Sequence, residues 1–199
     1  MAWAPDYVTA EQMREQARIP DLDDDTQVAR AITAASRAID RHCNRQFGKV
    51  GGVVERLYTA RPDYQAGYWT ADIDDVHTAS GLVVTVDGDA VATWSLKPSN
   101  AAADGRPWTR LAFTADSEHL PRGCDDEVAI ATAGWGWASV PLEVEQACVL
   151  QAHRFLSRRS TPFGVAGSPS DGSEMRLLSK VDPDVAVALG DVRRMRAAG

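Results

Sequence analysis

Four residues in the middle of the chain have the types and spacing of a metal-binding site. Asp72, Asp74, Asp75 and His77 fall within a short segment, and clusters rich in oxygen ligands can hold a divalent cation for nuclease chemistry. Aspartate is also frequent in turns, where its side chain accepts hydrogen bonds from nearby backbone amides. We favour a surface turn before a strand, with a metal-dependent nuclease as the alternative, because no second ligand set or general base accompanies the cluster.

Three other segments resemble chemical motifs but lack a defining residue. The run Asp21–Asp25 has neither the glycine nor the final glutamate of an EF-hand loop, and helix capping explains it. The segment Gly164–Gly172 lacks the Gly-Lys-Ser/Thr ending of a P-loop. The segment Gly134–Trp137 has no serine nucleophile between glycines, so Trp135 and Trp137 are expected to pack a strand–helix seam or a neighbouring subunit. We therefore expect a protein that is not an enzyme, with no catalytic residue, no metal site and no cofactor.

Composition and net charge exclude further classes of function. The chain has 199 residues, of which 44% are hydrophobic and 25% charged, which is enough to bury a core in one domain or two small ones. Its net charge of −7 argues against a main task of gripping nucleic acid. No apolar run reaches the roughly 18 residues of a membrane span, and the first residues lack a signal-peptide pattern, so we expect synthesis into the cytoplasm and no membrane partner. Cys43, Cys124 and Cys148 form no Cys-x-x-Cys pair, which disfavours a disulfide framework or a zinc knuckle.

Apolar residues at helical spacing predict helices near both ends of the chain. The clearest helix follows Asp25 and ends at about Asn44, with a basic stripe opposite its apolar one. This basic stripe is either a solvated face, a subunit contact or a surface facing a DNA channel. The predicted helices are Thr9–Ile19, Asp25–Asn44, Pro141–Arg159 and a short one after Asp182 that carries Val185, Leu189 and Val192; the stripe consists of Arg30, Arg37, Arg41 and Arg45.

Between Gly48 and about Val140 the sequence alternates between short apolar runs and turn residues, which predicts antiparallel strands. Asp87-Gly88 predicts a hairpin, because a type I′ turn requires positive φ at both central residues. The predicted strands are Val53–Thr59, Leu82–Val86, Ala90–Leu96, Thr109–Phe113 and Glu127–Ala133, with a further short one at Met175–Lys180.

These elements predict an α+β fold in which a small helical core, made from N- and C-terminal helices, carries an inserted antiparallel β module and an extended C-terminal arm. The predicted divisions are residues 1–48 for the N-terminal helices, 49–139 for the β module, 140–160 for the long helix that completes the core, and 161–199 for the arm.

Five segments of the chain carry motifs that occur together in one family of proteins. They are Tyr7-Val8-Thr9 with Ala17-Arg18-Ile19, Asp24-Asp25 with Cys43–Gly48, Val128 through Gly134-Trp135 to Val140-Pro141, Arg158–Val165, and Val181–Val185. In these segments the chain resembles the head-to-tail adaptor or head-completion proteins of long-tailed double-stranded DNA bacteriophages. The N-terminal part is most similar, the region around Gly134-Trp135 follows, and the C-terminal segment is third.

The resemblance implies a structural virion protein in the head–tail neck, assembled in the bacterial cytoplasm. Identical copies would form a ring, expected to be a dodecamer, that binds the portal protein, receives a stopper or tail-side connector, and lets double-stranded DNA pass without sequence-specific contact. The arm, roughly Pro162 to Arg196, would dock on the portal; the alternative is that it folds back on its own core. The docking residues implied are Phe163, Val165, Met175, Leu177, Leu178, Val185, Leu189, Arg193, Arg194 and Arg196. Arg30, Arg37, Arg41, Arg45, Trp135 and Trp137 would contact a neighbouring subunit or face the channel.

Two further alternatives remain open. Another connector component, a stopper or a tail terminator, would also form a ring with a β-rich body, although long helices at both ends disfavour it. A regulatory DNA-binding protein would use the arginine stripe, but the net acidity and the lack of a base-reading motif weigh against it.

Overall fold

The chain divides into a helical unit and a β unit. The computed structural model describes residues 3–17, 25–114, 121, 127–159, 165–166, 175–176 and 182–195. The helical unit consists of Met1–Phe47 with Val140–Gly199, and the β unit of Gly48–Ser139. Helices together with antiparallel sheets confirm the predicted α+β class.

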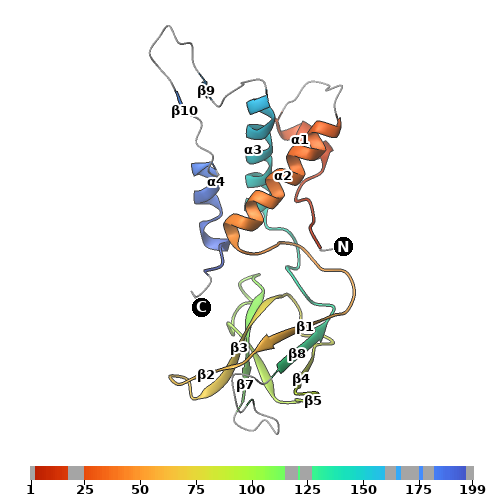
Figure 1. The fold of residues 1–199 in the computed structure, drawn as a ribbon. Helices are drawn as coiled ribbons and strands as arrows, with labels where there is room; N and C mark the ends of the chain where they lie inside the picture. Colours follow the sequence, from red (N-terminus) through yellow and green to blue (C-terminus); the bar gives the residue numbers. More distant parts are fainter. Residues whose placement is uncertain are drawn as a thin grey trace. The chain divides into compact units, whose positions relative to one another are not determined.

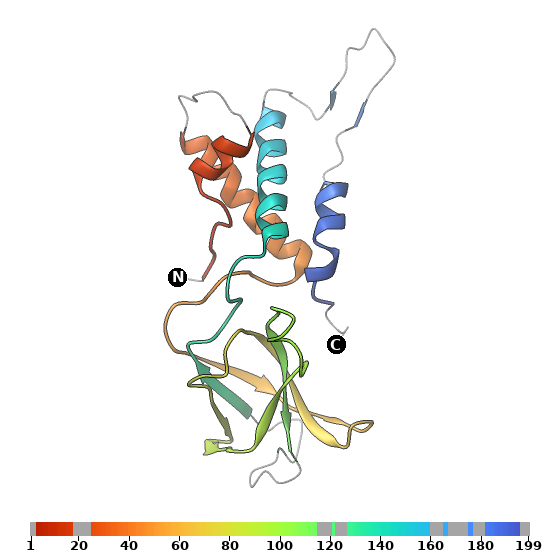
Figure 2. The ribbon, with the colours of Figure 1, turned by 180° about the vertical axis from the view of Figure 1, so that it is seen from behind.

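In the helical unit, α2 and α3 pack side by side, α1 lies against both, and α4 lies against α3 (Figure 1). Helix α2 passes in front of α3 in Figure 1 and behind it in the reverse view of Figure 2, so the two helices form a layer with two outer faces. The described elements are α1 (Ala10–Ala17), α2 (Asp25–Cys43), α3 (Leu142–Arg159), the two-residue strands β9 (Val165–Ala166) and β10 (Met175–Arg176), α4 (Pro183–Ala188) and a 3₁₀ turn, η2 (Gly190–Val192).

Helix α2 buries the apolar stripe from which it was predicted. Every member of the stripe is buried, and Ser36 on the same side meets Cys148 of α3, with 3.4 Å between Oγ and Sγ. The helix ends where Asn44 takes a positive φ of 54°, a conformation that asparagine tolerates better than most residues. The stripe residues are Val28, Ile32, Ala35, Ile39 and Cys43.

Helix α1 begins with a reciprocal capping pair. The amide of Gln12 donates to Thr9 Oγ1 at 3.2 Å, and the amide of Thr9 donates to Gln12 Oε1 at 2.7 Å. This capping box satisfies two amides that have no partner within the helix. It explains why the helix begins at Ala10, as predicted from Thr9.

Helix α4 is tied to α3 at its first turn. Asp182 caps it by accepting from the amide of Asp184 at 3.0 Å, and the same aspartate pairs with Arg154 of α3 at 2.7 Å. The amide of Asp182 also donates to Gln151 Oε1 at 3.3 Å. Beyond η2, the amide of Arg194 donates to the carbonyl of Cys43 at 2.8 Å. The described tail, residues 182–195, therefore folds back on the helical unit.

The β unit contains two antiparallel four-stranded sheets, with strand orders β1-β8-β4-β5 and β2-β3-β7-β6. Side chains from both sheets fill one core, which includes Ile73, Leu111 and Ile130. The strands are β1 (Val54–Thr59), β2 (Arg61–Asp63), β3 (Tyr68–Val76), β4 (Val83–Val86), β5 (Asp89–Ala90), β6 (Trp94–Lys97), β7 (Trp108–Phe113) and β8 (Glu127–Thr132).

Two features of the β unit test the sequence predictions closely. Asp87 and Gly88 have φ values of 51° and 91° between β4 and β5, which confirms the predicted hairpin turn. The single strand predicted at Ala90–Leu96 is wrong, because Ala90 ends β5 and a separate strand, β6, begins at Trp94 in the other sheet. Of the short strand predicted at Met175–Lys180, Met175 and Arg176 pair with β9, and the rest lies outside the described residues.

Candidate interaction surfaces

The sequence predicted that the four residues with metal-site spacing lie in a surface turn, and this prediction is wrong. Three of them lie on strand β3 and the fourth, His77, directly follows it. Asp72, Asp74 and Asp75 all belong to β3, and the register of β3 against β7 shifts between Asp72 and Val76. Ordinary strand alternation places Asp72 and Asp74 outside and Asp75 inside the unit, and the irregularity buries Val76 next to Asp75. Strand pairing with β7 therefore overrides the low strand propensity of aspartate.

Each aspartate of β3 has a protein partner. Asp72 pairs with Arg110 on the neighbouring strand at 2.9 Å, and Asp74 pairs with Arg56 of β1 at 2.6 Å. The buried Asp75 accepts a hydrogen bond from the Trp137 indole at 2.9 Å. Within the described part of the chain, no three His, Cys, Asp or Glu side chains gather as they would around a metal ion.

Both indoles of the Gly134–Trp137 segment are buried in the β unit, at 0% exposure for Trp135 and 5% for Trp137. The Trp135 indole donates to the carbonyl of Val54 at 2.7 Å, and the guanidinium carbon of Arg56 lies 4.6 Å from the ring centroid. Neither side chain has surface to offer a neighbouring subunit. The sequence did not predict this contact between Arg56 and Trp135, which joins residues far apart in the chain.

The arginine stripe of α2 is shorter than predicted. Arg30 and Arg41 are exposed. Arg37 is half-buried and pairs with Asp40 at 3.1 Å, and Arg45 lies beyond the end of the helix, half-buried. The outward basic surface of α2 therefore depends mainly on Arg30 and Arg41.

The predicted docking residues of the tail fall into four groups. Val185 and Leu189 are both fully buried in the helical unit, so a partner could reach them only if α4 left α3. Arg193 is exposed and Arg194 half-buried. The backbones of Val165 and Met175 belong to β9 and β10, whereas Phe163, Leu177, Leu178 and Arg196 lie outside the described residues.

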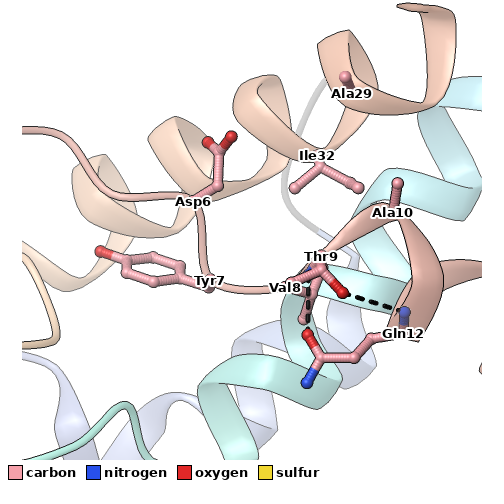
Figure 3. A pocket seen from close by; sticks show the side chains of 8 residues that line it. All are labelled: Asp6, Tyr7, Val8, Thr9, Ala10, Gln12, Ala29 and Ile32. Atoms are coloured by element: carbon pink, nitrogen blue, oxygen red, sulfur yellow. Dashed lines mark hydrogen bonds between the residues drawn. The ribbon is translucent and has the colours of Figure 1, made fainter. Parts of the chain in front are cut away.

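The N-terminal segment and α2 enclose a hollow of about 320 Å³ (Figure 3). Ala29 and Ile32 of α2 line one side of it and the start of α1 another, while the Asp6 carboxylate accepts from Thr33 Oγ1 at 3.0 Å. The hollow holds one carboxylate and no cation among its lining residues, and the capping pair of α1 forms part of its wall. It is a shallow depression between packed elements, and the carboxylate that lines it is already hydrogen-bonded to Thr33.

Beside this hollow, a buried polar cluster ties the N-terminal segment to α2. The Tyr7 hydroxyl donates to the Asp40 carboxylate and accepts from the Phe47 amide at 3.1 Å, and Arg37 donates to the carbonyl of Pro5. Burial and the neighbouring Asp40 raise the pKa of the Tyr7 hydroxyl, and burial raises the pKa of the Asp40 carboxyl against the opposing effect of Tyr7 and Arg37. These groups anchor the N-terminal segment to α2.

Replacing Tyr7 by phenylalanine should lower the free energy of unfolding by about 1 to 3 kcal/mol, because Asp40 loses its hydroxyl donor and the Phe47 amide its acceptor. Urea unfolding followed by far-ultraviolet circular dichroism measures the change. Tyr64→Phe is the matched control: Tyr64 is 89% exposed, so its change should stay within about 0.5 kcal/mol. Equal effects of the two changes would contradict the anchoring role.

Large exposed apolar side chains mark the surfaces that remain for partners. They occur on the outer face of α3, on the outer face of the sheet β1-β8-β4-β5, at the turn after β2 and in the tail. These residues, with their exposed fractions, are Leu142 67% and Leu150 52% on α3, Val53 71%, Leu57 56% and Val83 54% at the sheet, Tyr64 89% at the turn, and Val187 82% and Met195 85% in the tail.

Solved structures with a similar fold come from particles of the gene transfer agent. One is a chain in a structure described as the neck of an empty GTA particle computed with C6 symmetry; it is 20% identical, the match covers 100% of this chain and 96% of that one, and the TM-score is 0.57. A second is a chain of the virion of a native gene transfer agent particle, 21% identical, covering 97% and 92% of the two chains with a TM-score of 0.52. No protein-family model matches the chain, and no curated protein matches it.

None of the helices formed by the described residues combines the length and the apolar character needed to cross a lipid bilayer.

Proposed function

We propose that this protein is a structural component of the neck of a phage-like particle, where identical copies form an adaptor ring between the portal and the tail-side connector. The ring extends the channel through which double-stranded DNA passes. The protein acts through its surfaces and catalyses no reaction.

The observation that carries the proposal is the fold similarity to the neck chain, which extends over 100% of this chain and 96% of that one. Both the helical and the β unit, with their order along the chain, belong to the match. A likeness confined to one unit would be compatible with many functions.

The surface chemistry supports the same role. A net charge of −7 suits a channel protein, because each cation fixed on a phosphate adds affinity that would slow the passage of DNA. Exposed apolar side chains on α3, on the sheet and in the tail are typical of a protein that is buried on several sides in an assembly.

For portal docking we propose the outward residues of the described tail. Val187 and Met195 are 82% and 85% exposed, and Arg193 lies exposed between them along the chain. This set supplies apolar burial and a cation for an acidic group of the portal. Val185 and Leu189 instead hold α4 on the helical unit.

The test is electron microscopy of the full chain mixed with the portal protein of the same particle. We expect a ring capping one end of the portal, and loss of the cap with Val187→Asp and Met195→Asp together. These changes leave the Asp182–Arg154 pair intact, whereas deletion of the tail would also strip α4 from α3. Tyr64→Asp, at a side chain equally exposed but on the β unit, is the control and should leave the cap in place.

Absence of a cap with the unaltered chain would overturn the adaptor role and favour a stopper or tail terminator. A cap that survives the double substitution would overturn only the assignment of the docking residues.

A further inference from the structure

We propose that neighbouring copies of this chain bind each other through the two outer faces of the α2–α3 layer, so that the outer face of α3 in one copy packs against the outer face of α2 in the next. This inference rests on the proposed ring and names the surfaces that build it.

The two faces lie on opposite sides of the helical unit. Ser36 of α2 and Cys148 of α3 meet at the centre of the layer, and the buried residues of both helices gather on that side. Exposed residues of α2 recur at helical spacing on the side opposite Ser36, and those of α3 on the side opposite Cys148. The ribbons show only the order of the helices, with α2 in front of α3 in Figure 1 and behind it in Figure 2. The α2 face consists of Arg30, Ala34 and Arg41, with Arg37 and Ala38 half-exposed; the α3 face consists of Leu142, Glu143, Gln146, Leu150 and His153.

The faces are complementary in shape and charge. The α3 face carries two large apolar side chains, Leu142 and Leu150, and the carboxylate of Glu143. The α2 face carries two exposed arginines and, between them, the small side chain of Ala34. A leucine of one helix can seat above an alanine of another, and an exposed carboxylate attracts the arginine.

Charge also decides which faces meet. Two α2 faces would bring arginines together, and two α3 faces would bring the Glu143 carboxylates together, so a two-fold contact of either face with itself is disfavoured. A contact between two different surfaces leaves one copy with a free α2 face and the other with a free α3 face. Repetition of such a contact builds a ring when the rotation between successive copies closes, as the proposed function requires.

The register of the existing α2–α3 contact fits this pairing. The two helices run in opposite directions along the vertical of Figures 1 and 2. Arg41 lies five positions after Ser36 and Glu143 five before Cys148, so each lies about 7.5 Å from that contact along its own helix, and both lie toward the same end of the crossed pair. Ala34 and Leu150 lie two positions away in the opposite sense. A neighbouring copy of the ring at the same level therefore brings Glu143 toward Arg41 and Leu150 toward Ala34.

Cysteine cross-linking of the full chain tests this contact directly. The background carries Cys124→Ser, while Cys43 and Cys148 stay, since burial raises the pKa of each thiol to about 11 and keeps it unreactive near neutral pH. Oxidation of Arg41→Cys/Glu143→Cys should give a ladder of covalent oligomers. Either single substitution should give no product, and an equal mixture of the two should give dimers only. Dimers from one single variant alone would show a two-fold contact and overturn the proposal.

The second measurement compares two matched substitutions, each of which introduces a negative charge. Leu150→Glu should raise the concentration needed for assembly by about tenfold or more, because it buries an unpaired carboxylate in the contact. Leu57→Glu is the control: Leu57 is 56% exposed against 52% for Leu150, but it lies on the β unit, and its substitution should leave the ladder unchanged. Glu143→Arg should weaken assembly, and Glu143→Arg with Arg41→Glu should restore it.

The outcomes separate this inference from the proposed function. Rings seen by microscopy without a cross-linked ladder, or unaffected by Leu150→Glu, would overturn the contact surfaces and leave the neck role standing. A chain that forms neither rings nor cross-links, alone or with the portal, would overturn both.

Discussion

Gly136→Ala should lower the free energy of unfolding of the β unit by about 3 kcal/mol or more. Gly136 has a φ of 92°, and a Cβ atom on it would lie 2.0 Å from the carbonyl oxygen of Gly48. That oxygen accepts the hydrogen bond of the Trp137 amide at 3.0 Å, so it cannot move away without breaking the bond. The substitution therefore combines an unfavourable backbone conformation with a backbone clash.

Gly88→Ala separates these two effects. Gly88 has a nearly equal φ of 91°, but a Cβ atom there meets nothing within 4 Å. We expect a loss of only about 1 kcal/mol from the backbone conformation. Tryptophan fluorescence during urea unfolding is a suitable readout, because five of the six tryptophans lie in the β unit. Equal losses for the two substitutions would show that the close approach to Gly48 is not what constrains Gly136.

Trp135→Ala should lower the free energy of unfolding by about 3 to 5 kcal/mol, the range for removal of a large buried aromatic side chain. Trp135 is fully buried among the residues of the β core, and Tyr58 packs against it with ring centroids 6.0 Å apart. The substitution also removes the donor to the Val54 carbonyl and the ring beneath the Arg56 guanidinium.

Trp135→Phe keeps most of the ring and removes the indole donor, so its loss should be smaller, about 1 to 3 kcal/mol. Circular dichroism is the better measurement here, since the substitutions change the fluorescence itself. Tyr64→Ala, at a side chain 89% exposed, should change stability by less than about 0.5 kcal/mol. A stability unchanged by Trp135→Ala would contradict its place in the core.

Local patterns predicted the elements whose signals lie within a few neighbouring residues. The stripe from Val28 to Cys43 specifies helix α2 by its own spacing, and Asp87-Gly88 specifies its turn by the φ values that it tolerates. Strand β3 escaped prediction because its aspartates are stabilised by partners distant in the chain. Arg110 lies 38 residues from Asp72, and no spacing rule connects them.

The surfaces were harder to predict than the elements, because an apolar stripe does not reveal what covers it. Val185 and Leu189 have the spacing of an amphipathic helix, which fits a portal contact and contact with α3 equally well. In the structure these two residues are buried in the helical unit, and the Asp182–Arg154 pair at the start of α4 holds α4 on α3. Leu142 and Leu150 were not singled out, because their exposure follows from the positions of α1, α2 and α4 around α3.

The pairing of α2 with α3 also sets the order in which the protein can form during synthesis. Ser36 and Cys148 are 112 residues apart, so the stripe of α2 lacks its main partner, α3, until the ribosome has made the chain beyond the β unit. The β unit, by contrast, is continuous in sequence and can close first. Until α3 emerges, α2 leaves an apolar surface exposed on the nascent chain, and this interval is when the protein is most prone to aggregate or to need a chaperone.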